Sequence, residues 1–527
     1  MRVYDINNNL KVSEMKILDC TLRDGGYYTN WDFSKDLVKN YLECFNQLPV
    51  NYLEIGYRSK KLNGYLGEYF YCPVMVLEEM RNLTSKKLVI ILNEKDIRKE
   101  DLDDLLKPII GLIDMVRIAI DPANFKRALG LAEKVKSFGF KVGFNVMYMS
   151  NWATEKEFIQ LIPECKGITD YFYMVDSFGG VYPEDVVNTI NLVRSKTDVK
   201  LGFHGHNNLE LGLINTLTAL DHGVEMVDAT VTGMGRGAGN LKLELLLTVL
   251  NAKGILDFDF NSLSKLVDKF TILQDEYKWG TSLPYMVSGA NSLPQKNVME
   301  WVSKRFYSFN SIIRALANQS RGLDDNEKLP TIDFSSTKKY KSALIVGGGP
   351  SAVIHSKAIE SFIKSQPEMV IIHSSSRNAM CFSEVLNDQI FCLVGNEGYR
   401  MEDVFGDVSK IDGICILPPF PRKMGTYIPE KLRDKSYELG KVTISENLKD
   451  THTAIALETV IALGIKELYI VGYDGYSGKS KGAKEEEVFA ENEQLFKNAK
   501  LNGLSCVSIT STLYKSLDQE SVFSSIM

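Results

Sequence analysis

The chain has 527 residues and a formal net charge of −6, and its 44% hydrophobic and 24% charged residues are typical of a globular protein with a large core. Its length predicts more than one domain, because single cores stop growing at about 250–300 residues. The acidic balance argues against a nucleic-acid-binding protein, which normally carries a basic face. The polar N-terminal segment MRVYDINNNLKVSE, the lack of any run of about 18 apolar residues and eight cysteines without a C-x-x-C pair predict a cytoplasmic protein with free thiols and no membrane contact.

Short apolar runs recur along the first half of the chain, and segments with the apolar spacing of amphipathic helices lie between them. Strand and helix alternating eight times predict a (β/α)8 TIM barrel over residues 1–255. An open, doubly wound parallel sheet is the alternative. The eight predicted strands are residues 16–20, 51–56, 87–93, 114–120, 141–148, 170–176, 199–205 and 225–231.

Polar residues stand at the ends of several of these runs. In a barrel the functional side chains lie at the carboxyl ends of the strands, where a packed core has no need of polar groups. We therefore expect four of these residues to bind substrate, namely Glu54, Asn145, Ser177 and Thr232.

A pair of histidines ends the seventh predicted strand. His204 and His206 are two residues apart, so both rings point to the same side of the strand. Asp24 follows the first strand, and with the two imidazoles it would form a face of two histidines and one carboxylate around a metal ion. Gly25 and Gly26 are expected to allow a tight turn with positive φ. The alternative is a histidine-rich surface loop, with Arg23 and Asp24 as an exposed ion pair.

Three motifs in this order resemble the DRE-TIM metallolyase superfamily: TLRDG at residues 21–25, HGHNN at 204–208 and GMGRGAGN at 233–240. The segment VDSFGGVYPEDV, residues 175–186, is similar to the 4-hydroxy-2-oxovalerate aldolase branch, and the resemblance covers about residues 15–300.

The resemblance implies a divalent metal, Mn2+ or Mg2+ in the first place and Zn2+ or Co2+ otherwise. It implies that Arg23 stabilises an enolate and that the small-molecule partners are a 2-oxo acid and an aldehyde. The metal ligands that it implies are Asp24, His204, His206 and Asn240.

Tyr27 departs from the aldolase pattern, in which a histidine stands three residues after the metal-binding aspartate. A tyrosine is a poor base at its ordinary pKa of about 10. Either Tyr27 positions a hydroxyl group while a water or another residue takes the proton, or the substrate and the reaction differ. The alternatives are a Claisen-type reaction with an acyl-CoA, and a barrel without turnover joined to a nucleotide-sugar-related transferase domain.

Residues 256–325 predict helices after the barrel, which would pack on its mouth or form the surface of a homodimer. Residues 326–340 are polar and charged without periodicity, and predict a linker.

Residues 341–527 predict a second, Rossmann-like open α/β domain, since apolar runs alternate again with helical patterns. Gly347, Gly349 and Ala352 fit the pattern G-x-G-x-x-A between a strand and a helix, which predicts backbone amides facing the phosphate of a nucleotide or sugar phosphate. The next strand ends in His373 and serines, whereas NAD enzymes need an acid there. The domain is similar over a short stretch to sialyltransferase-like and 6-hydroxymethylpterin pyrophosphokinase-like proteins. A scaffold or assembly domain is the alternative.

Overall fold

The computed structural model describes residues 15–303, 309–336, 338–422, 424–476 and 483–526. The chain divides into two compact units, Met1–Glu300 and Trp301–Met527. Among the described residues, no helix combines the length and the apolar character that a membrane crossing requires.

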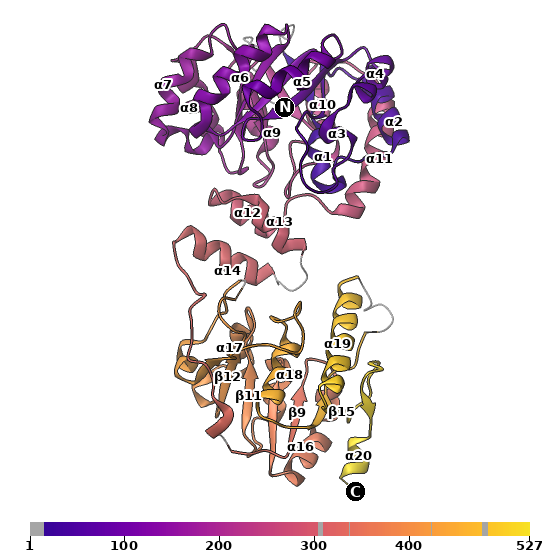
Figure 1. Cartoon of the computed structure of the whole chain (residues 1–527), viewed down its shortest axis with the longest axis vertical. Coiled ribbons are helices and arrows are strands. Elements are labelled where there is room, and N and C mark those ends of the chain that lie inside the picture. Colours follow the sequence, from indigo (N-terminus) through magenta and orange to yellow (C-terminus); the bar gives the residue numbers. More distant parts are fainter. Residues whose placement is uncertain (1–14, 304–308, 337, 423, 477–482, 527) are drawn as a thin grey trace. The chain divides into compact units, whose positions relative to one another are not determined.

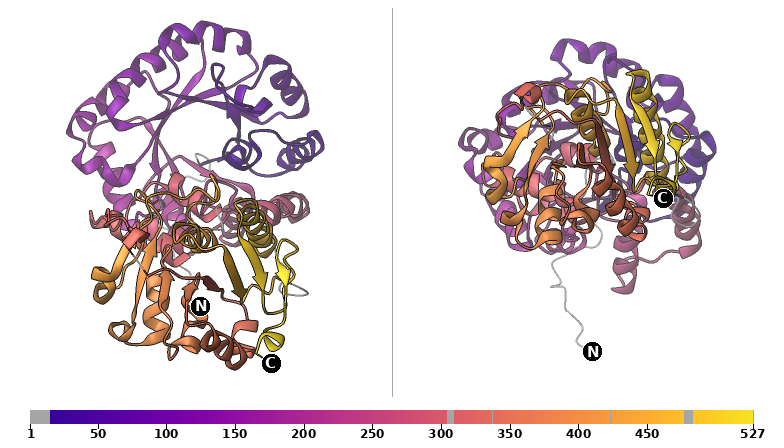
Figure 2. Two further views of the ribbon diagram at one scale, coloured as in Figure 1. Left: turned by 60° about the horizontal axis from the view of Figure 1, so that its bottom comes forward. Right: turned by 90° about the horizontal axis from the view of Figure 1, so that it is seen from below.

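The first unit is a closed barrel of eight parallel strands in sequence order, with β1 paired to β8 (Figures 1 and 2). This confirms the predicted (β/α)8 barrel, and each predicted strand is present. The strands are β1 Lys16–Asp19, β2 Tyr52–Tyr57, β3 Lys87–Asn93, β4 Met115–Ile120, β5 Lys141–Val146, β6 Tyr171–Asp176, β7 Lys200–Gly205 and β8 Met226–Ala229.

The strands alternate their side chains between two cores, as the period of two in a β-strand requires. Leu18 belongs to the cluster inside the barrel with Met115 and Tyr173, whereas Ile17 faces outward into the larger cluster under the helices. The interior is therefore filled by side chains, and the carboxyl ends of the strands remain for chemistry. The surrounding helices include α2 Lys35–Gln47, α4 Val74–Leu83, α5 Leu102–Leu106, α6 Phe125–Ser137, α7 Lys156–Leu161, α8 Pro183–Arg194, α9 Gly212–Asp221 and α10 Leu243–Ala252.

Short helices follow two of the strand ends, and further helices follow the barrel. Asn208, just after β7, donates to the carbonyl of Tyr285 in α12 at 2.9 Å and accepts from Gln295 Nε2 in α13 at 2.7 Å. The first post-barrel helices thus pack on the carboxyl-terminal mouth, which is one of the two predicted positions. The elements are α1 Thr21–Thr29, α3 Glu68–Tyr71, α11 Phe260–Tyr277, α12 Leu283–Ala290 and α13 Gln295–Ser303.

The second unit is an open parallel sheet in the order β13-β12-β11-β10-β9-β14-β15-β16, which confirms a second α/β domain. Ala343 and Ile345 pack with α18 and α19 on one face, while Leu344 and Val346 pack with α16 and α20 on the other. The strands are β9 Ser342–Val346, β10 Met369–His373, β11 Gln389–Cys392, β12 Gly413–Leu417, β13 Ser436–Glu438, β14 Glu467–Val471, β15 Ser505–Ser508 and β16 Asp518–Gln519, and the helices are α14 Phe309–Ser320, α15 Ser351–Ile354, α16 Ser356–Ser365, α17 Glu397–Phe405, α18 His452–Ala462, α19 Ala483–Leu501 and α20 Val522–Ser525.

The division between the units lies earlier than the predicted linker at 326–340. Helix α14 belongs to the second unit, because Arg314 donates to the carbonyls of Gly395 and Met424 at 3.0 and 3.1 Å. Within the predicted linker, Leu329 N donates to Glu438 Oε2 at 3.1 Å. The composition of these segments predicts a helical extension of the barrel and a linker. Their contacts are with residues about 80 or more positions later in the chain, and no local pattern in the sequence indicates such contacts.

Candidate metal and catalytic site

Helix α1 starts directly after β1 and carries Arg23 and Asp24 into the barrel mouth. The predicted positive-φ turn at Gly25 and Gly26 is wrong, since both glycines lie inside this helix. Their role is to leave space: a Cβ on Gly25 would lie 2.5 Å from Met234 Sδ, and one on Gly26 would lie 2.1 Å from the ring of Trp31. Gly25 lets the helix approach Met234 in the loop after β8, and Gly26 makes room for the Trp31 ring just after the helix.

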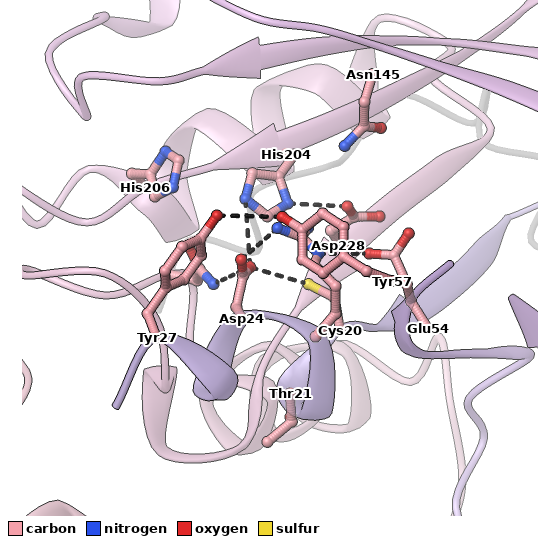
Figure 3. Close-up of polar contacts among 12 residues, drawn as sticks. Cys20, Thr21, Asp24, Tyr27, Glu54, Tyr57, Asn145, His204, His206 and Asp228 are labelled. Atoms are coloured by element: carbon pink, nitrogen blue, oxygen red, sulfur yellow. Dashed lines mark hydrogen bonds and ion pairs between the residues drawn. The ribbon is translucent and has the colours of Figure 1, made fainter. Parts of the chain in front are cut away.

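Asp24 and His204 meet at the mouth, although 180 positions separate them (Figure 3). His204 Nε2 lies 3.9 Å from Asp24 Oδ2, and Asn240 Nδ2 donates to the same oxygen at 2.8 Å. His206 is next to them, with its ring centre 5.0 Å from that of His204. Asp24 and His204 are almost fully buried. Asp24, His204 and Asn240 thus lie together with the His206 ring beside them, while the group whose ligand atoms all lie within 4.8 Å of one another is Cys20, Asp24 and His204.

Both histidines are held through Nδ1, which leaves Nε2 as the atom that could bind a metal. His204 Nδ1 lies 2.8 Å from Asp228 Oδ2, and His206 Nδ1 lies 2.6 Å from the carbonyl oxygen of Asp176. Burial lowers the pKa of both imidazoles, so they are neutral near pH 7, the form in which histidine binds a metal. Burial raises the pKa of Asp24, but Arg23, the two histidines and the hydrogen bond from Asn240 together lower it below its ordinary value, and the carboxylate stays ionised.

The donor set fits a divalent cation. Two atoms that each lie about 2.1 Å from one ion are at most about 4.2 Å apart, so the separation of Asp24 and His204 is compatible with a shared ion. Asn240 Oδ1 is buried and has no hydrogen-bond partner among the described residues. Cys20 also lies in this cluster, 3.6 Å from Asp24 Oδ2, but burial raises the pKa of its thiol, which therefore acts as a donor to the carboxylate.

A buried network of charges lies next to this cluster. Glu54 Oε2 accepts from Arg23 Nε at 2.8 Å and lies 3.4 Å from Arg117 Nη1, while Arg117 Nη2 donates to Asp228 at 2.6 Å. Arg23 also contacts Asp24. Three carboxylates thus face two guanidinium groups, and a bound divalent cation would offset the negative excess.

The predicted substrate-binding residues take different positions. Glu54 is fully buried between the two arginines, and Asn145 accepts from Arg117 Nε at 2.8 Å, so both orient guanidinium groups. Ser177 Oγ accepts from the backbone amide of Tyr148 at 2.9 Å. The hydroxyl of Thr232 donates to the neighbouring Val231 carbonyl, and its own carbonyl accepts from the indole of Trp279 at 3.1 Å. Direct contact of these four residues with substrate stays a prediction.

Tyr27 lies beside this network and is paired with Tyr57. The two hydroxyl oxygens are 3.1 Å apart, and the guanidinium of Arg236 lies 4.1 Å from the centre of the Tyr27 ring. Burial raises the pKa of Tyr57 well above its ordinary value, so the Tyr57 hydroxyl keeps its proton. Either hydroxyl can be the donor in this pair, and when Tyr57 donates, the hydroxyl hydrogen of Tyr27 points to other partners.

Four residues of the site were missed by sequence reasoning: Cys20, Tyr57, Asp228 and Arg236. Asp228 carried a detectable signal, because a charged residue inside the apolar run EMVDATV is costly to bury unless it has a partner. Tyr57 and Arg236 carried none, since their roles depend on contacts with a distant tyrosine.

In the second unit, the predicted phosphate-binding glycines follow β9. Gly349 N donates to the carbonyl of Gly472 at 2.8 Å, and a Cβ on Gly349 would lie 1.9 Å from Asp474 Oδ2. Asp474 also accepts from Ser351 N at 3.2 Å, at the start of α15, which is only four residues long. Ala352 is fully buried. Close packing against the loop after β14 thus accounts for the small residues, and a nucleotide at this turn stays a prediction.

Comparison with known proteins adds an independent line of evidence. The model of the family described as HMGL-like matches residues 117–269. Oxaloacetate decarboxylase of Mycobacterium tuberculosis is 30% identical over 252 residues, which cover 46% of this chain and 71% of that protein. A 4-hydroxy-2-oxovalerate aldolase of Geobacillus genomosp. 3 is 30% identical over 258 residues, covering 46% of this chain and 72% of that protein.

A solved structure shows the same likeness at higher identity. The crystal structure of the N-terminal domain of a candidate aldolase from Bacteroides vulgatus is 58% identical, with a TM-score of 0.55, and it covers 57% of this chain and 100% of that chain. The barrel, the three motifs at its strand ends and these relatives agree. Through its first unit the chain belongs to the HMGL-like family within the DRE-TIM metallolyase superfamily, and it is a lyase.

Proposed function

We propose that the barrel is a divalent-metal-dependent lyase that forms or cleaves a carbon–carbon bond of a 2-oxo acid through an enolate of the pyruvate type. The observation that supports this most directly is the position of Arg23. Its Nη2 is buried and has no hydrogen-bond partner among the described residues, and the same side chain contacts Asp24 within the cluster of metal-binding donors. A cation fixed at that point suits an oxygen on which negative charge develops.

Asp24, His204, His206 and Asn240 would hold the metal. When bound, a divalent cation would act as a Lewis acid that draws electron density from the keto group of the substrate. Mixed oxygen and imidazole donors suit Mn2+, and Mg2+, Zn2+ or Co2+ are the alternatives.

The residues around the donors supply position and charge. Glu54 accepts from Arg23 Nε at 2.8 Å, which fixes the plane of the guanidinium and leaves Nη2 for the substrate oxygen. Asp228 fixes the tautomer of His204 by accepting from Nδ1. Because these side chains are already in place before a substrate binds, little reorganisation is needed as the charge develops.

The tyrosine pair favours a reaction in which no substrate hydroxyl group has to be deprotonated. Cleavage of a 4-hydroxy-2-oxo acid requires removal of the 4-hydroxyl proton, for which a tyrosine is a poor base; with Tyr57 as the donor in the pair, Tyr27 presents a hydrogen to the substrate instead. In the decarboxylation of a 2-oxo diacid, the C–C bond to the carboxylate breaks, its electron pair forms the enolate, CO2 leaves, and a proton is then added to carbon. Tyr27 can donate in that last step. Decarboxylation is therefore the second candidate, and the M. tuberculosis relative is named for such a reaction.

Proton exchange tests the enolate before any substrate is known. The protein with Mn2+ should exchange the methyl protons of pyruvate in D2O, as NMR would show, and Arg23→Lys should slow the exchange strongly. Turnover of oxaloacetate against 4-hydroxy-2-oxovalerate then separates decarboxylase from aldolase, and an arm with acetyl-CoA tests the Claisen alternative. If neither exchange nor turnover occurs with any of the four metals, the barrel is the non-catalytic module of the remaining alternative. Gel filtration with light scattering tests the predicted homodimer.

A further inference from the structure

The second unit contains a large cavity over the carboxyl ends of its strands. Its volume is about 1200 Å3, and its wall is formed by α14, by the segments after β11 and β12, and by the start of α18. Ligands of open parallel α/β sheets bind beyond the carboxyl ends of the strands. Sites for small molecules usually measure about 300–1,000 Å3, so this cavity has room for a nucleotide or a phosphorylated sugar.

A buried carboxylate organises one wall of this cavity. Glu397 is 3% exposed, and its Oε1 accepts from the backbone amide and the hydroxyl of Ser376, both at 2.6 Å. Its Oε2 lies 3.3 Å from both Arg400 Nη1 and His452 Nε2. Burial raises the pKa of Glu397, but its contacts with His452, Arg400 and Ser376 together have the larger, opposite effect. The pKa of Glu397 is therefore lowered to about 2. Glu397 therefore stays charged and lies against the Arg400 guanidinium and the His452 ring.

Arg400 and His452 remain partly exposed where they line the cavity. Their side chains are 44% and 42% exposed, in contrast to the carboxylate that holds them. Arg400 Nη1 also lies 3.2 Å from Ser375 Oγ, which orients the guanidinium from a second side. A planar guanidinium held in this way presents its remaining N–H groups in the geometry that matches two oxygens of a phosphate.

The N-terminus of α18 lies at the same place. His452 is its first residue, and Thr451 caps the helix by accepting from Ala454 N at 3.2 Å. The partial positive charge of a helix N-terminus adds to the positive charge of the Arg400 guanidinium. This corner differs from the glycine turn after β9, where the carboxylate of Asp474 lies against the first amide of α15 and would repel a phosphate.

We propose that this cavity binds a small molecule with a phosphate group and hydroxyl groups, with the phosphate held between Arg400, His452 and the start of α18. Arg321 and Lys449 add positive charge elsewhere on the wall, and the carboxylates of Asp403 and Glu446 are acceptors for hydroxyl groups. Tyr399, stacked on Tyr427 with ring centres 3.5 Å apart, offers an aromatic surface for a sugar face or a base.

Binding to the full-length protein tests the proposal. Isothermal titrations without metal use inorganic phosphate, glucose 1-phosphate and UMP, with glucose and uridine as partners that lack the phosphate. At least one phosphate-bearing organic probe should bind, and its partner should not. Arg400→Gln and His452→Asn should each weaken binding about 10- to 100-fold, as expected for the loss of charge-assisted hydrogen bonds. A preference for UMP or for glucose 1-phosphate identifies the ligand as nucleotide or sugar phosphate.

Two controls make the result specific. Arg433→Gln removes an arginine of the same unit that is 52% exposed and does not line the cavity, and it should bind as wild type does. Asp24→Ala alters the barrel site and should also leave probe binding unchanged. The proposal is overturned if no phosphate-bearing probe binds, if binding survives both cavity substitutions, or if Asp24→Ala abolishes it. Because Arg400 and His452 are partly exposed, both variants should fold, and circular dichroism should show the wild-type spectrum for each.

Discussion

Replacing Asp228 by asparagine tests whether the metal site depends on a residue that does not itself bind the metal. Asp228 Oδ2 accepts from His204 Nδ1 at 2.8 Å and from Arg117 Nη2 at 2.6 Å, and its side chain is 1% exposed. Asparagine keeps the size of the side chain but removes the negative charge. That charge favours the tautomer of His204 with the hydrogen on Nδ1 and a free lone pair on Nε2. Loss of such an outer partner typically lowers metal affinity about 10- to 100-fold, or about 1.4–2.7 kcal/mol.

The same substitution affects stability through Arg117. The guanidinium of Arg117 is fully buried. In the variant, Glu54, at 3.4 Å, would be its remaining charged partner among the described residues. Breaking a buried ion pair costs about 3–5 kcal/mol, and the asparagine oxygen should reduce that loss by continuing to accept one hydrogen bond. We expect a lower free energy of unfolding in urea and weaker Mn2+ binding by calorimetry of the metal-free protein.

A matched variant separates the local effect from a general loss of acidic charge. Asp198→Asn removes a carboxylate that is 70% exposed and paired with Lys166 at 2.9 Å, and both quantities should stay at wild-type values. If the folded Asp228→Asn protein binds Mn2+ as tightly as wild type, Asp228 does not orient His204 and the reasoning fails.

Three further predictions concern the barrel. Tyr57→Phe removes the hydrogen-bond partner of the Tyr27 hydroxyl and should lower kcat for 2-oxo acid turnover about 3- to 10-fold with unchanged Mn2+ affinity, whereas an unchanged kcat would exclude a role for the pair. Gly202→Ala places a Cβ 2.4 Å from the buried ring of Tyr173 and should destabilise the protein by about 1–3 kcal/mol in urea unfolding; a neutral result would mean that the barrel interior has free space. Burial raises the pKa of Asp19 from 3.8 to about 7, so the folded state keeps a proton that the unfolded state loses above about pH 4, and stability should fall as the pH rises toward 7. Asp19→Asn should flatten this dependence, and an unaltered pH profile of unfolding would contradict the assignment.

The sequence by itself determined the barrel and the meeting of the segments that carry Asp24 and His204. Strand and helix periods are local, and the rule that parallel strands end at one edge places Asp24 and His204 at one mouth without further information. The alternation of Ala343 and Leu344 between two faces of the second sheet follows from the same period.

Only the tertiary structure decided how these groups are supported. Asp228 holds His204, the Tyr57 hydroxyl pairs with that of Tyr27, and the absence of a side chain at Gly25 leaves space for Met234. The cavity beside Glu397 likewise depends on helix α14, which the sequence analysis assigned to the helices after the barrel. Each of these contacts joins residues far apart in the chain, and their energies depend on burial and on the orientation of one side chain against another, which are properties of the packed structure and have no periodic signal in the sequence.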